Sequence, residues 1–88
     1  MPESRPRLAP GVRLHRDAVR DAWVLLSPER IIETEGPAHD ILSRCDGQRT
    51  VDEIVDELAA QYAAPREEIA TDVADLLAEL AQKRMVVL

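Results

Sequence analysis

The spacing of the apolar residues changes near residue 36, and this change constrains the fold more than any other feature of the sequence. Before it, apolar and polar residues alternate in short stretches, as they do in strands with one buried face. After it, apolar residues recur every three or four positions, as they do on one face of an amphipathic helix. The sequence therefore predicts an α+β domain in which a three-stranded antiparallel sheet is followed by a three-helix bundle.

Three strands are expected in the first half, over residues 12–15, 18–27 and 30–34. Residues 23–26 (WVLL) are four consecutive apolar residues, which suggests that both faces of the second strand are covered there. Pro28 pre-sets a turn between the second strand and the third. The third strand is short and ends the meander, so we expect it to lie at an edge of the sheet, where its backbone groups would be open to a partner.

Three helices are expected in the second half. Gly36 and Pro37 would begin the first helix, and Gly47 would end it. Thr50 and Glu53 have the spacing of a capping box, which would open the second helix. Pro65 would start the third helix, which runs to residue 84. The apolar tail 85–88 would form a strand or cover the core.

The termini and the composition set the domain organisation. Eighty-eight residues make one domain, which we place at residues 11–88. Residues 1–10 hold three of the six prolines, so we expect an extended arm without an ordered element. No apolar run approaches the ~20 residues that span a bilayer, and the start of the chain has no signal-peptide pattern. We therefore expect a cytoplasmic protein.

Charge argues against nucleic acid as a partner. Residues 1–20 carry a net charge of +3, but the remaining residues hold six basic and fifteen acidic side chains. The expected third helix has three basic and five acidic residues, so phosphates would repel it. A winged-helix DNA-binding regulator is therefore the weaker alternative.

No constellation of residues points to catalysis, to a metal or to a cofactor. His15 and His39 fall on different elements, and neither has the convergent donors that a metal needs. Cys45 is the single cysteine and is expected to be a small buried apolar side chain. The carboxylates fall on the polar faces of the helices. We expect no enzymatic activity.

Several segments in order resemble the pyrroloquinoline quinone biosynthesis protein D (PqqD) family. They are PGVRL from Pro10, WVLLSPE from Trp23, CDG from Cys45 and TV..IV from Thr50. The resemblance covers about residues 10–87. It implies a winged-helix-like fold and a peptide chaperone in pyrroloquinoline quinone biosynthesis, a RiPP (ribosomally made, modified peptide) recognition element. Such a protein binds the precursor peptide PqqA and presents it to the radical S-adenosylmethionine (SAM) enzyme PqqE.

The resemblance also implies a site and leaves alternatives open. The peptide would add a strand to the third strand and pack on the third helix. This places the candidate peptide-binding residues at Arg30, Ile31, Ile32, Glu33, Thr34, Val73, Leu76, Leu77 and Leu80. Which of the helical residues face the peptide is not decided by the pattern. The first alternative is a leader-peptide module of another RiPP pathway, and both a monomer and a homodimer are compatible with the sequence.

Overall fold

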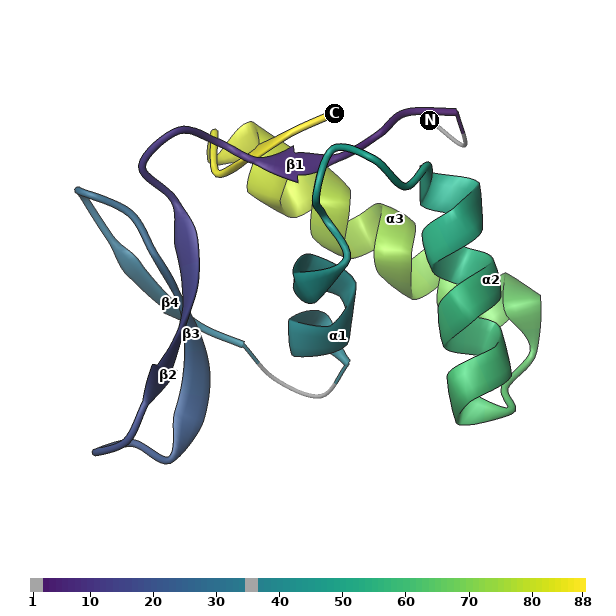
Figure 1. The fold of residues 1–88 in the computed structure, drawn as a ribbon, viewed down its shortest axis with the longest axis horizontal. Helices are drawn as coiled ribbons and strands as arrows, with labels where there is room; N and C mark the ends of the chain where they lie inside the picture. Colours follow the sequence, from purple (N-terminus) through teal and green to yellow (C-terminus); the bar gives the residue numbers. More distant parts are fainter. Residues whose placement is uncertain (1–2, 35–36) are drawn as a thin grey trace.

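The computed structural model describes residues 3–34 and 37–88. In chain order, its elements are β1 (Arg7–Leu8), β2 (Arg13–Asp17), β3 (Ala22–Leu26), β4 (Ile31–Glu33), α1 (Ala38–Ser43), α2 (Val51–Tyr62), α3 (Arg66–Gln82) and β5 (Val86–Val87). Figure 1 shows the sheet of β2, β3 and β4 at one end of the molecule and α2 at the other, with α1 between them. The expected α+β fold, with three strands followed by three helices, is confirmed.

The larger sheet is antiparallel, with the strand order β2-β3-β4. The strand β3 begins at Ala22, four residues later than expected, because residues 18–21 form the hairpin turn. Asp17 shapes this turn: its Oδ1 accepts hydrogen bonds from the backbone N–H groups of Val19 and Arg20. An aspartate that binds the backbone two residues ahead competes with strand pairing. Since β3 is central, β4 is an edge strand, as the sequence predicted.

Residues 3–10 of the N-terminal arm contain an ordered element, which corrects the expectation that the arm has none. Arg7 and Leu8 form β1, which pairs antiparallel with β5, and the backbone N–H of Ala9 donates to the carbonyl of Met85. Pro6 is fully buried. Pro6 and Pro10 do not prevent this pairing, because the neighbouring residues supply the backbone donors. Figure 1 shows β1 and the C-terminal segment side by side over the helices.

The first helix is shorter than the sequence predicted. Pro37 is its N-cap instead of its first helical residue, and Gly36 lies outside the described residues. The helix ends at Ser43 instead of near Gly47, because Asp46 forms a bridge with β1 and accepts backbone hydrogen bonds in the following turn. Cys45 is buried just after the helix, where its thiol donates to a carbonyl of α1 at 3.3 Å.

The second helix begins as predicted. The Thr50 hydroxyl accepts from the Glu53 N–H at 3.1 Å, and the Glu53 carboxylate accepts from the Thr50 N–H at 2.9 Å. This capping box satisfies two of the backbone donors that a helix start leaves free. The third helix follows Pro65 as its N-cap. The starts of α2 and α3 thus lie at the capping box and at the proline from which the sequence predicted them.

The core is aliphatic and is shared by both halves of the chain. It joins β3 to all three helices and to β5, and it contains Leu25, Ile41, Leu42, Cys45, Val51, Ile54, Val55, Leu58, Ile69, Val73, Leu77, Leu80, Met85 and Val86. Met85 and Val86 are 2% and 4% exposed, so the C-terminal tail is both a strand and a cover for the core, as expected. The sheet is thereby fixed against α3, and the space between β4 and α3 has a rigid floor.

Candidate functional site

The strand β4 is attached to the sheet on one side only. At one end, the Thr34 N–H donates to the Trp23 carbonyl at 3.0 Å. At the other end, the Ser27 N–H donates to the Arg30 carbonyl, also at 3.0 Å. Among the described residues, no strand pairs with the outer side of β4. The segment from Arg30 to Thr34 is therefore held in an extended conformation with one edge unpaired.

The hydrogen-bond pattern shows which backbone groups face outward. In an antiparallel pair, the residues that exchange hydrogen bonds alternate along the strand. Ile32 lies opposite Leu25, midway between the two hydrogen-bonded ends, so its N–H and carbonyl face β3. The N–H and carbonyl groups of Ile31 and Glu33 must then face away from β3. These two residues offer donors and acceptors at the spacing that an added strand requires.

A groove of about 220 Å³ lies beside this edge, between β4, α1 and α3. Its lining residues are Leu25, Ile32, Glu33, Thr34, Ala38, Leu42, Leu76, Glu79 and Leu80. Leu25, Leu42 and Leu80 are at most 2% exposed and form a floor that belongs to the core. Ile32 and Leu76 are half-buried, so they leave apolar surface open to a ligand.

The structure brings together some of the predicted site residues and separates others. Five of the nine line this groove: Ile32, Glu33, Thr34, Leu76 and Leu80. Arg30 lines the next hollow along β4. Ile31 is 57% exposed, and its position next to Ile32 puts its side chain on the opposite face of the sheet.

Val73 and Leu77 do not face the groove. Both are 0% exposed within the core, so a charged substitution at Leu77 would perturb folding before it reported on a ligand. The apolar stripe of α3 has two neighbours: Val73 and Leu77 lie in the core, whereas its margin at Leu76 and Leu80 lines the groove beside β4. This margin could not be assigned from spacing, because it depends on how α3 crosses the sheet.

Ala38, Leu42 and Glu79 were not among the site residues predicted from the sequence. All three line the groove. The signal that could have found the first two is the small number of residues between β4, which ends at Glu33, and α1, which begins at Ala38. Glu79 lies one turn after Leu76 on α3 and adds a carboxylate to the rim.

The groups with reactive chemistry lie away from an open site or are held in unreactive forms. Burial raises the pKa of the Cys45 thiol to about 12, with a further contribution from the charge of Asp46. The thiol therefore stays protonated, whereas a nucleophilic cysteine must be a thiolate. His39 stacks on Trp23 with ring centroids 4.3 Å apart and is half-buried, as expected for a boundary residue. His15 is exposed on β2.

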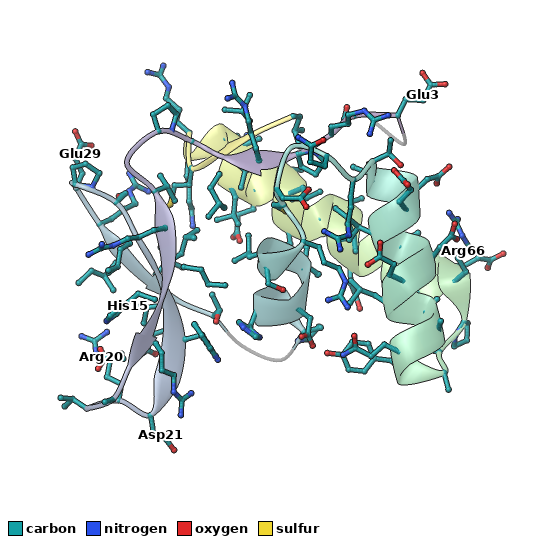
Figure 2. The ribbon with its side chains drawn as sticks, in the orientation of Figure 1. Glu3, His15, Arg20, Asp21, Glu29 and Arg66 are labelled. Carbon is teal, nitrogen blue, oxygen red and sulfur yellow. The ribbon has the colours of Figure 1, made fainter. Side chains whose placement is uncertain are left out.

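Charged side chains surround the molecule. Figure 2 shows Glu3, Arg20, Asp21, Glu29 and Arg66 at the outside of the molecule, in the N-terminal segment, the two hairpin turns and α3. Within residues 3–34 and 37–88, no three His, Cys, Asp or Glu side chains gather in a way that would hold a metal ion. None of the described helices combines the length and apolar character needed to cross a bilayer.

Comparison with known proteins finds one family model and several relatives that match most of the chain. The family model of coenzyme PQQ synthesis protein D (PqqD) matches residues 22–86. A PqqA binding protein of Bradyrhizobium diazoefficiens is 46% identical over 80 residues, which cover 91% of this chain and 78% of the relative. A PqqA binding protein of Xanthomonas oryzae pv. oryzae is 45% identical over 84 residues, with 96% and 91% covered.

Two solved structures are similar in fold and in sequence. One is the solution structure of the PqqD part of Methylobacterium extorquens PqqCD, described as a functional, stand-alone RiPP recognition element. It has a TM-score of 0.81 and 42% identity, with 94% of this chain and 88% of that chain covered. The other is the crystal structure of PqqD from Xanthomonas campestris, with a TM-score of 0.65, 43% identity, and 100% and 98% covered.

Proposed function

The chain belongs to the coenzyme PQQ synthesis protein D (PqqD) family, and from this membership we propose that it is a peptide-binding adaptor for the precursor peptide PqqA. The observation that carries the proposal is the open edge of β4 beside an apolar groove. An extended peptide added at this edge would bind through its main chain to Ile31 and Glu33. Alternate side chains of the peptide would then point into the groove between β4 and α3.

Each part of the site has a distinct role in this mechanism. The main-chain hydrogen bonds at β4 give affinity that depends little on the peptide sequence. The half-buried Ile32 and Leu76 give selectivity for an apolar side chain. A flexible peptide loses conformational entropy when it binds, so this apolar contact must offset the cost. The rigid floor of Leu25, Leu42 and Leu80 helps because the groove itself does not have to be ordered on binding.

The adaptor carries out no chemistry of its own in this proposal. It presents PqqA to the radical SAM enzyme PqqE, which modifies the peptide. Because the precursor is made by ribosomes, the proposed place of action is the cytoplasm. The groove lies within one chain, so the proposal holds for a monomer and for a homodimer alike.

Isothermal titration calorimetry with synthetic PqqA tests the proposal. The PqqA peptide of Bradyrhizobium diazoefficiens is a suitable probe, because that organism's PqqA binding protein is 46% identical to this chain. We expect saturable binding of PqqA and none of a leader peptide from an unrelated RiPP pathway. Tighter binding of the unrelated leader would favour a recognition module for another pathway. Retention of the chain on duplex DNA at low salt would favour a regulator instead.

A further inference from the structure

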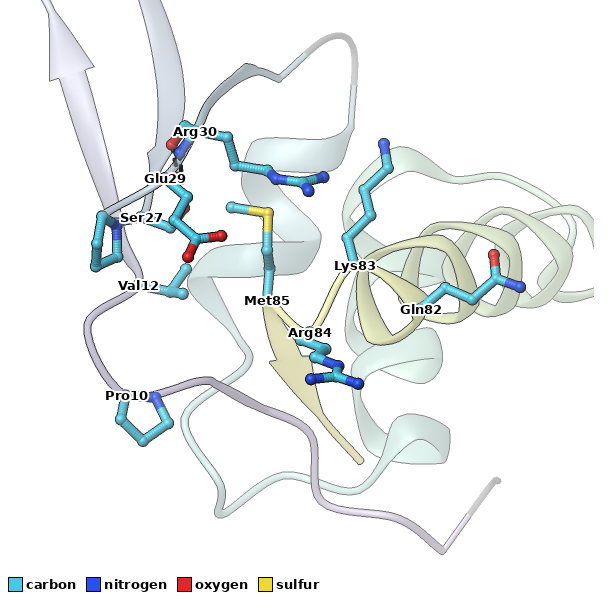
Figure 3. Close-up of a pocket in the computed structure, with 10 residues that line it drawn as sticks. Pro10, Val12, Ser27, Glu29, Arg30, Gln82, Lys83, Arg84 and Met85 are labelled. Carbon is cyan, nitrogen blue, oxygen red and sulfur yellow. Dashed lines mark hydrogen bonds between the residues drawn. The ribbon is translucent and has the colours of Figure 1, made fainter.

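A second hollow, of about 420 Å³, lies near the start of β4. It lies between the β3–β4 turn and the C-terminal end of α3, and its charged residues are three basic ones, Arg30, Lys83 and Arg84, and one acidic one, Glu29. Figure 3 shows the guanidinium of Arg30 reaching across the Met85 side chain toward Lys83, with Arg84 on the other side of Met85. Three cations and the carboxylate of Glu29 thus lie around one apolar side chain, in a chain of net charge −6.

Two of these cations have no carboxylate close to them. Among the described residues, neither Arg30 nor Arg84 has a carboxylate oxygen within 4.0 Å, and Lys83 has only Glu79, at 3.8 Å. Six other arginines in the chain do have such partners: Arg5, Arg16, Arg20, Arg44, Arg49 and Arg66. The lining of this hollow therefore carries three cations against one carboxylate, that of Glu29.

The backbone at Arg84 is also unusual. Its φ is +61°, in the left-handed region, at the position after the helix cap where glycine is favoured. The surrounding hydrogen bonds impose this conformation: the Arg84 N–H donates to Ala81 and the Met85 N–H to Leu80. Glycine would suit this backbone better, but it would not place a guanidinium in the hollow.

The opposite end of the groove has the opposite charge. Beyond Ala38 and Leu76, a further hollow is lined by Asp72 and Asp75. Cations thus outnumber carboxylates beside the first residue of β4, whereas the charged residues beyond its last residue are carboxylates. A bound peptide would experience this difference in sign along its whole length.

We infer that Arg30, Lys83 and Arg84 bind an Asp or Glu side chain of the peptide and thereby fix its direction on β4. This inference rests on the proposed function and identifies the charge pattern that the groove selects. The strands β2, β3 and β4 are all antiparallel, and an antiparallel addition is the more stable kind. An antiparallel peptide ends beside Arg30, so the acidic residue lies on the C-terminal side of the bound segment.

A double-mutant cycle tests the inference. One arm compares the unchanged chain with Arg30→Gln/Arg84→Gln, and the other compares PqqA with a version that has Asn and Gln in place of its Asp and Glu. Exposed ion pairs are individually weak, so we expect the double variant to bind PqqA about fivefold more weakly and to respond less to added salt. With the neutral peptide, the two proteins should bind equally within about twofold.

The matched control is Arg7→Gln/Arg13→Gln, which removes the same charge at two exposed arginines on β1 and β2. It should bind PqqA as the unchanged chain does. An equal loss for both peptides, or no loss in the double variant, would overturn the role of the cations while leaving peptide binding established. Failure of the unchanged chain to bind PqqA would overturn the proposed function and this inference with it.

Discussion

A proline at position 33 separates peptide binding from folding at the β4 edge. The Glu33 N–H faces away from β3, so its loss removes no hydrogen bond of the sheet. Proline is tolerated on an edge strand where the N–H side faces solvent. Ile32→Pro would instead remove a donor that faces Leu25 and damage the sheet itself. Glu33→Pro therefore changes the open edge alone.

The expected loss follows from one main-chain hydrogen bond. A hydrogen bond exchanged with water contributes about 0.5–1.5 kcal/mol net. A loss of about 1 kcal/mol corresponds to about fivefold in Kd. The Glu33 side chain adds little, because its ion pair with Arg20 is about half exposed, and exposed pairs contribute little.

Calorimetry with PqqA, on Glu33→Pro and on Glu33→Ala, measures what the main-chain hydrogen bond contributes to the affinity. Glu33→Ala removes the same side chain but keeps the N–H, so it should bind like the unchanged chain within about twofold. Circular dichroism should show the same helix content in all three proteins. Equal affinity of a folded Glu33→Pro and Glu33→Ala would refute main-chain pairing at this edge.

Three further predictions concern the groove wall and the helix ends. Leu76→Gln should weaken PqqA binding about tenfold, as measured by calorimetry, with a small change in stability. Leu77→Ala should instead lower the free energy of unfolding by about 2–5 kcal/mol, as measured by denaturant unfolding, because Leu77 is fully buried. Ala63→Gly should raise the unfolding free energy by about 1 kcal/mol, since Ala63 has a φ of +51° at the α2 C-cap. The Thr50 N–H holds the pKa of Glu53 below its ordinary value of 4.5. The stability from this lowered pKa is complete above 4.5 and is lost as the pH falls through the folded-state value, so Glu53→Gln should flatten the acid side of the stability curve.

Each of these three predictions has an outcome that would contradict it. Unchanged affinity in Leu76→Gln would exclude that side chain from the site. A destabilised Ala63→Gly would mean that α2 ends in another conformation. An unchanged acid profile in Glu53→Gln would mean that the capping carboxylate is not coupled to folding.

Features set by neighbouring residues were predictable from the sequence. The capping box at Thr50 and Glu53 is one case, because both of its hydrogen bonds close within four residues. The edge position of β4 is another, because an antiparallel meander leaves its last strand at the edge. These features require no knowledge of how the sheet packs on the helices.

Features set by distant contacts were not predictable. The pairing of Arg7 with Val87 joins the two ends of the chain, and nothing local to either segment specifies it. The division of the α3 stripe between core and groove depends on the angle at which α3 meets the sheet. Spacing alone groups Leu76 with Leu77, although one is half-buried and the other fully buried.

Hydrogen exchange of the β4 amides, followed by NMR with and without saturating PqqA, is the most direct test of strand addition. The Ile32 amide faces β3 and should exchange slowly in both states. The amides of Ile31 and Glu33 should exchange fast in the free chain and slowly in the complex. If PqqA binds while both of these amides keep their fast exchange, the peptide does not pair with β4, and the account is contradicted.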